Sequence, residues 1–231
     1  MLGVPVAVQA AEQASPTEAP STLNPVPVEP SAEETTRFIF GSRLIARDTG
    51  AAVELDVRAR FPGGIQLGVA TSASALERAY ITGQTATGVA GVSGSAIFLA
   101  PLLTAERLTL DLRVKGGVAG LYDVGGSDET ALRQVNELGF FAHVALDEDW
   151  LLRAGAVIGV ELELGDAVLV ADQSQLLDFA VGYALSDNVL GYVQTSGGGT
   201  FGFDGDNGKF LFEGSVGLRV PFGEGGAHVA F

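Results

Sequence analysis

The feature that most constrains this chain is a regular alternation of apolar and polar residues along many segments. Between Arg107 and Val118, Leu108, Leu110, Leu112 and Val114 occupy alternate positions, and mostly charged residues lie between them. Successive side chains of a β-strand point to opposite faces, so this period of two predicts a strand with one apolar and one polar face. A soluble sheet buries its apolar face, whereas a transmembrane barrel turns it outward to lipid. The fold therefore depends on which face is inside.

Ten segments after residue 36 carry this pattern with varying strength. The expected strands are 37–47, 51–61, 64–72, 87–100, 106–119, 135–147, 150–163, 174–185, 189–198 and 209–222. Several are longer than the roughly 5–6 residues usual in soluble sheets. They are long enough for a tilted membrane-spanning strand, which needs about 9–11 residues. Strand length therefore favours the transmembrane alternative.

The connections between these segments alternate in length. Turns rich in Gly, Pro, Asp and Asn are expected at 62–64, 101–105, 147–149 and 186–188, with a further short connection at 48–50. Longer polar or Gly-rich loops are expected at 73–86, 120–134, 164–173 and 199–208. Transmembrane barrels have short periplasmic turns, longer external loops and an even strand number. We predict an all-β fold, an antiparallel up-and-down transmembrane β-barrel of about ten strands, with eight or twelve also compatible.

Two flanking segments and a tail complete the predicted organisation. Residues 1–11 are typical of the end of a secretory signal peptide. Residues 12–36 are rich in Pro and Glu and predict a disordered periplasmic linker; 37–222 form the barrel and 223–231 a C-terminal tail. The chain has no cysteine, which excludes disulfides and thiolate metal sites. Its net charge of −15 argues against nucleic-acid binding, which needs clustered Lys and Arg.

Together these features resemble small bacterial outer-membrane β-barrels, the family of the outer-membrane protein A transmembrane domain and of small porin-like barrels. In that family the last strand alternates apolar residues and ends in Phe, a signal for the barrel-assembly machinery. Val216, Leu218, Val220 and Phe222 match this pattern, and the chain also ends in Phe231. The resemblance implies a Gram-negative outer-membrane location with outer-membrane lipid and the assembly machinery as partners. It implies no enzyme activity and no cofactor, and it names no external ligand for the loops.

The polar faces of the predicted strands carry charges of both signs, which would converge on a narrow lumen. Unpaired buried charges are costly, so we expect them to form a paired network. The expected members are Arg43, Glu54, Asp56, Arg58, Arg60, Arg107, Asp111, Arg113, Lys115, Glu137, His143, Arg153, Glu161, Asp178, Glu213 and Arg219. Such a network predicts a structural role or a narrow porin-like channel.

Two alternatives are compatible with the sequence. An outer-leaflet lipid-modifying enzyme would use His143, oriented by Glu137 or Asp178, although the nucleophile motif G-x-S-x-G is absent. A soluble lipocalin-like barrel would have the opposite orientation, with Leu108, Leu110 and Leu112 facing a core. The segment 204–208 has some likeness to a calcium loop but lacks the final Glu ligand, so no metal site is predicted.

Overall fold

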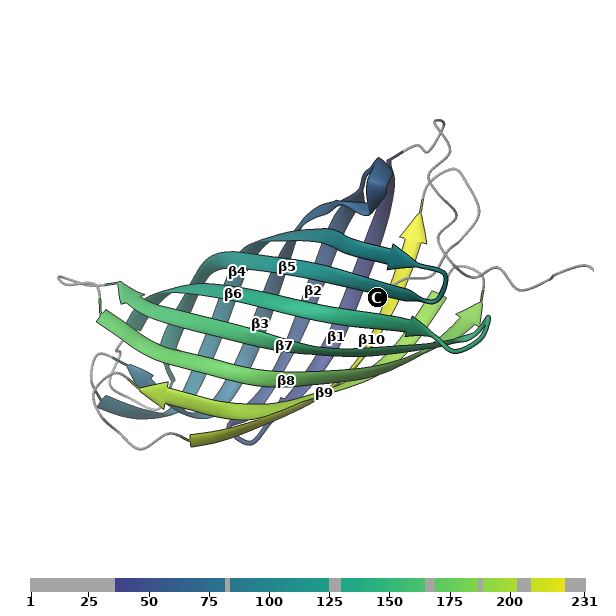
Figure 1. Cartoon of the computed structure of the whole chain (residues 1–231). Helices are drawn as coiled ribbons and strands as arrows, with labels where there is room; N and C mark the ends of the chain where they lie inside the picture. Colours follow the sequence, from purple (N-terminus) through teal and green to yellow (C-terminus); the bar gives the residue numbers. More distant parts are fainter. Residues whose placement is uncertain are drawn as a thin grey trace, which may run out of the picture.

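The computed structural model describes residues 36–81, 84–124, 130–164, 169–186, 189–202 and 209–222. In these ranges the chain forms ten strands and one short 3-10 turn: β1 (Arg37–Arg47), β2 (Gly50–Arg60), η1 (Pro62–Gly64), β3 (Gln66–Ile81), β4 (Gln84–Ala105), β5 (Leu108–Asp123), β6 (Thr130–Ala145), β7 (Trp150–Leu164), β8 (Leu169–Ser186), β9 (Val189–Gly202) and β10 (Lys209–Phe222). Each strand pairs antiparallel with its sequence neighbours, and β1 pairs with β10 to close a barrel (Figure 1). The predicted fold class and the count of ten strands are confirmed.

The closing seam between β1 and β10 has a continuous register. Phe38 lies opposite Phe222, Phe40 opposite Val220 and Leu44 opposite Val216. Side chains at directly opposed positions point to the same face of a sheet. The apolar positions of the first and last strands therefore continue one surface, and Phe222 is the last residue of β10.

Several strands extend further than the alternation predicted. The expected loop 73–86 is mostly strand, because β3 runs to Ile81 and β4 begins at Gln84. The expected loops 120–134 and 164–173 are shortened in the same way by β5, β6 and β8, and 199–208 by β9. These stretches are rich in small or polar residues and lack a period of two, yet the backbone ladder to neighbouring strands holds them in the wall. The predicted loop boundaries were wrong there.

The turn predicted at 101–105 is also displaced. β4 continues to Ala105, and the register shifts between Pro101, opposite Asp111, and Leu103, opposite Leu110. Proline has no N–H to donate to the ladder, so a bulge accommodates it while the strand resumes beyond. The turn itself lies at residues 106–107.

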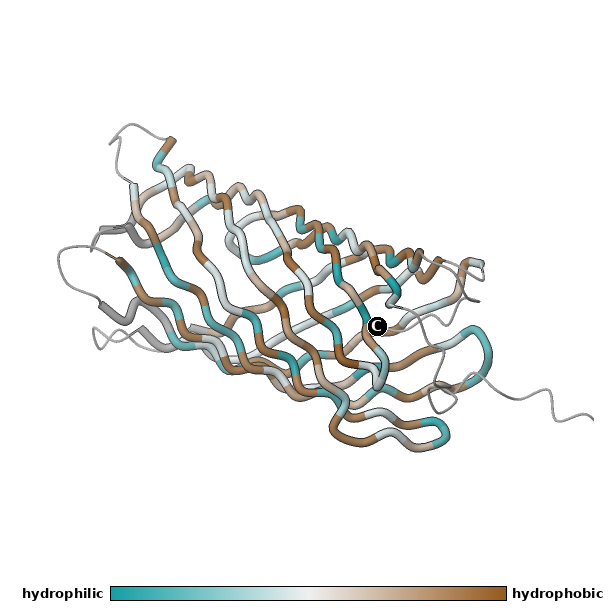
Figure 2. The backbone as a smooth tube through the Cα atoms, turned by 90° about the horizontal axis from the view of Figure 1, so that it is seen from above, coloured by the Kyte–Doolittle hydropathy of each residue, from teal (hydrophilic) through white to brown (hydrophobic). Residues whose placement is uncertain are grey.

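Hydrophobic and hydrophilic residues alternate along many of the strands (Figure 2), and the large apolar side chains among them are exposed on the outer face of the barrel. Leu55, Phe140 and Val193 face outward with 42%, 51% and 64% of their surface exposed, although in water such residues would be buried. Near the end that holds Phe222, the Trp150 and Tyr183 rings contact each other with centroids 4.8 Å apart. An apolar exterior with aromatic residues toward its edge is the surface of a membrane-spanning barrel.

The soluble alternative is therefore wrong, because the side chains it required inside share the outward face with Val114 and Val118, which are 41% and 50% exposed. The predicted signal-peptide remnant, nearly all of the linker, the C-terminal tail and the segment 204–208 lie outside the described residues.

Candidate functional site

The lumen is the candidate functional site, since strand pairing directs charged side chains from most of the strands into it. Between Gln66 and Leu76 of β3, and between Val89 and Leu99 of β4, the inward positions hold apolar, Gly, Ser or Gln residues. Ser72 and Ser93 face each other there, with their hydroxyl oxygens 2.7 Å apart. The charged residues of the other strands thus face a wall of mainly small, uncharged side chains.

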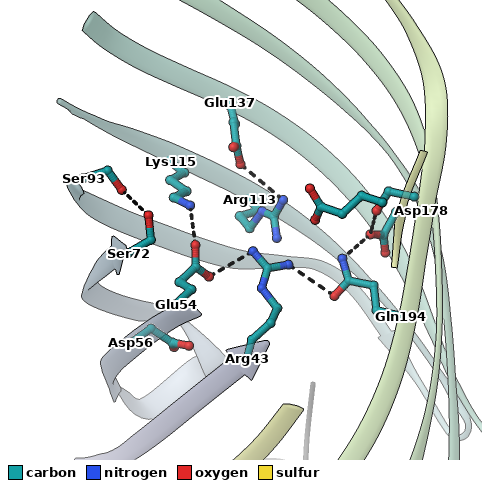
Figure 3. Close-up of polar contacts among 12 residues, drawn as sticks. Arg43, Glu54, Asp56, Ser72, Ser93, Arg113, Lys115, Glu137, Asp178 and Gln194 are labelled. Atoms are coloured by element: carbon teal, nitrogen blue, oxygen red, sulfur yellow. Dashed lines mark hydrogen bonds and ion pairs between the residues drawn. The ribbon is translucent and has the colours of Figure 1, made fainter. Parts of the chain in front are cut away.

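A chain of polar contacts crosses the centre of the lumen (Figure 3). Lys115 of β5 donates to Glu54 of β2 with Nζ and Oε2 2.9 Å apart. The other carboxylate oxygen of Glu54 accepts from Arg43 of β1 at 3.0 Å. Arg43 also contacts Gln194 Oε1 of β9 at 3.5 Å. Strands separated along the sheet are therefore joined through the lumen.

The chain continues to Asp178 of β8, which is 1% exposed. Its Oδ2 accepts hydrogen bonds from Gln194 Nε2 at 2.6 Å and Ser196 Oγ at 3.0 Å. Its Oδ1 accepts a hydrogen bond from Arg153 Nε of β7 at 3.0 Å, and Arg153 Nη2 lies 2.9 Å from the same oxygen as an ion pair. Three hydrogen bonds and the ion-pair contact of Arg153 Nη2 satisfy this carboxylate, and the charged contacts are the stronger class. Asp178 is the most completely partnered acid of the lumen.

Aromatic rings support the arginines in this part of the lumen. Arg113 and Arg153 both lie over Phe141, with their guanidinium carbons 4.7 and 5.0 Å from the ring centroid. A Cβ added at Gly139 or Gly155 would lie 2.5 Å from atoms of this ring. Glycine is therefore required at both positions for Phe141 to lie against the wall.

Further ion pairs lie above and below the central chain. Arg113 contacts Glu137 at 3.5 Å, Arg58 contacts Asp56 at 2.6 Å, and Arg47 contacts Glu213 at 2.8 Å. Arg133 contacts Glu161 at 3.0 Å and Glu163 at 3.6 Å toward the end farther from Phe222. His143 Nε2 lies 3.1 Å from Asp111 Oδ2 near the other end. Charges of opposite sign are thus paired along the length of the lumen.

The structure brings most of the expected network residues together in these pairs. Arg60 ends β2 and has a side-chain interaction of its own, and Arg219 lies inward on β10 over the Tyr192 ring. Arg107 is the exception: it lies in the turn 106–107, exposed, and donates to the carbonyl of Leu146 at 3.5 Å. β5 begins at Leu108, two residues later than the predicted strand 106–119, so Arg107 is outside the lumen.

Two residues that matter to the site were not among those predicted. Arg133 was assigned to a loop, although its spacing of two from Val135 and Glu137 could have placed it on the inward face. Gln194 carries no charge and so was not considered, yet it links Arg43 to Asp178. An inward amide on a strand rich in Gly is the signal that could have identified it.

No metal site is assembled in the described ranges. No group of three His, Cys, Asp or Glu residues there could hold a metal ion. Among the same residues, no helix is long and apolar enough to cross a membrane. The lumen chemistry found in these ranges is that of paired charges and hydrogen-bonding side chains.

No protein-family model matches the chain, and no curated protein matches it. Similar solved structures include the NanC porin, 9% identical, covering 78% of this chain and 98% of that one with a TM-score of 0.47. The KdgM porin is 11% identical, covering 80% and 99% with a TM-score of 0.41. The outer-membrane protease OmpT from Escherichia coli is 10% identical, covering 81% and 94% with a TM-score of 0.37. At such identities the likeness describes architecture alone.

Proposed function

We propose that this chain is a non-enzymatic barrel of the bacterial outer membrane whose lumen is a narrow, hydrated, porin-like passage for small solutes. The apolar exterior faces lipid, and the end holding both barrel termini, near Arg37 and Phe222, faces the periplasm. In this orientation the short turns at 61–65, 106–107 and 146–149 are periplasmic, as is usual in such barrels.

The observation that supports a passage is the partial solvent exposure of the central ion pairs. The side chains of Arg43, Glu54 and Lys115 retain 16%, 13% and 16% exposure, and those of Arg113 and Glu137 retain 21% and 27%. Water-sized space therefore reaches charges in the middle of the lumen. Opposite them, the Ser72 and Ser93 wall has small side chains that leave width for a solute.

The alternative function, an outer-leaflet enzyme, would need its candidate base His143 near the external rim of the barrel. His143 is paired with Asp111, two residues before β6 ends at Ala145, which is the proposed periplasmic side. A catalytic group acting on outer-leaflet lipid belongs near the opposite rim. We therefore assign His143 to the network of paired charges.

The test is electrical recording from purified barrel in planar bilayers. The wild type should give small discrete conductance steps, and Lys115→Ala should enlarge them because it removes the side chain that reaches across to Glu54. Thr71→Ala, a change on the exposed outward face of β3, should leave conductance unchanged. Folding is verified by faster gel migration before heating than after. If neither the folded wild type nor folded Lys115→Ala gives conductance steps, the proposed passage is refuted.

A further inference from the structure

Arg219 stands out in the lumen because no carboxylate among the described residues forms an ion pair with it. Its side chain is buried, with the residue 6% exposed, and in the described part of the chain neither Nε nor Nη1 has a hydrogen-bond acceptor. Its cross-strand neighbours are Gly41 of β1 and Leu190 of β9, which have no acceptor side chain, and the Asp56 carboxylate that lies over Gly41 is paired with Arg58. Buried polar groups are normally satisfied, so two free donors on a buried cation need an explanation.

Other arginines surround Arg219. Arg58 of β2 and Arg153 of β7 each lie close enough to Arg219 and Arg113 for electrostatic repulsion. Three of these four arginines have acids of their own, since Arg58 pairs with Asp56, Arg153 with Asp178 and Arg113 with Glu137. The group therefore carries one positive charge more than its paired acids compensate.

An aromatic ring holds Arg219 in place. Its guanidinium carbon lies 5.5 Å from the centroid of the Tyr192 ring. That ring is accommodated by Gly217, where an added Cβ would lie 2.6 Å from the ring carbon that bears the hydroxyl group. A guanidinium that stacks on an aromatic ring still has its N–H groups free to donate to an acceptor that lies in the guanidinium plane. The site is thus prepared for a ligand that brings negative charge.

We propose that the lumen binds a small oxyanion, bearing a carboxylate, phosphate or sulfate group, at Arg219, with Arg58 and Arg153 within electrostatic range. The anion accepts from the free Nε and Nη1 donors and offsets the surplus charge. Guanidinium groups suit the oxygens of such anions by geometry as well as by charge. The proposal rests on the hydrated lumen of the proposed function and narrows its solutes to anions.

The test is calorimetric titration of inorganic phosphate into the folded barrel in neutral detergent at constant ionic strength. The wild type should bind saturably, and Arg219→Gln should bind at least tenfold more weakly. Arg47→Gln is the matched control, since Arg47 is an inward arginine already paired with Glu213 at the other end of the lumen. Equal binding by wild type and Arg219→Gln, or no saturable binding by the wild type, would overturn the site.

A second measurement covers the case in which Arg219→Gln does not fold. Ligands that bind the folded state alone raise its stability with concentration. Phosphate should therefore raise the urea midpoint of the wild type more than sodium chloride at equal ionic strength, and the same midpoint in both salts would contradict the site. Neither measurement requires conduction, so a barrel that binds phosphate but is silent in bilayers would refute the passage and retain the anion site.

Discussion

Lys115 Nζ and Glu54 Oε2 lie 2.9 Å apart although β5 and β2 are separated in the sheet by β3 and β4. Their contact spans the lumen in front of the wall that holds Ser72 and Ser93. Glu54 also holds Arg43, so one carboxylate connects three strands. The width of the lumen at this level is therefore set by side chains.

Removing the Glu54 charge should destabilise the barrel more than removing the charges of Glu54 and Lys115 together. Glu54→Gln leaves two cations facing each other, and breaking a buried pair costs about 3–5 kcal/mol; partial exposure here should reduce the cost to about half. In the double variant with Lys115→Met, one of those cations is gone. Urea unfolding in detergent gives the stability of the single and the double variant. A double variant less stable than Glu54→Gln would contradict the expectation.

Asp178→Asn should be among the most destabilising single charge changes in the lumen. The substitution leaves Arg153 without its carboxylate in a site where Asp178 is 1% exposed, a loss of about 3–5 kcal/mol. Glu148→Gln, in an exposed turn, is the control and should change stability by less than about 0.5 kcal/mol. Similar unfolding midpoints for the two variants would show that the Asp178 cluster is not stabilising.

Gly155→Ala should disturb the position of Phe141. The new Cβ would lie 2.5 Å from both the Phe141 ring and the Phe140 carbonyl, and overpacking of this kind costs about 1–3 kcal/mol. Gly94→Ala is matched in chemistry but meets no atom within 4 Å, so its stability should stay close to that of the wild type. Urea midpoints compare the two, and equal values would mean that the wall adapts to the methyl group.

Charged residues introduced on the outer surface should lower the stability of the barrel by an amount that depends on their depth in the membrane. Phe140→Arg places a cation on the lipid face within β6, where the cost is about 2–4 kcal/mol near the midplane. Val124→Arg lies just beyond the end of β5 and should cost about 0–1 kcal/mol. The free energies of unfolding of the two variants from lipid vesicles measure this difference, and equal values would argue against lipid contact at Phe140.

The alternation of residues was sufficient to predict the strand number and the faces of the strong strands. It was insufficient for the strand ends beyond 72 and 120, because Ala, Ser and Gly carry little facial preference and cross-strand hydrogen bonds decide their structure. The turn at 106–107 shows the same limit, since β5 begins two residues later than predicted and leaves Arg107 in the turn, outside the lumen.

The membership of the charge network was largely predictable, but its pairing was not. Which carboxylate receives Lys115 depends on the curvature and stagger of the closed sheet, which bring β2 and β5 face to face. Periodicity within one strand contains no information on that geometry. The connection from Arg43 through Gln194 to Asp178 was missed for the additional reason that its middle member is uncharged.

The seam between Phe38 and Phe222 has a kinetic consequence. The barrel cannot close until its last strand has been synthesised and delivered, because β10 supplies the partner of β1. Every shorter intermediate has two unpaired edges, whose backbone groups invite pairing with other chains and cannot be tolerated in lipid. Pairing across such a long separation in sequence is also slow. Closure at the seam therefore has to wait for β10, and a truncation that removes β10 leaves the β1 edge open to aggregation.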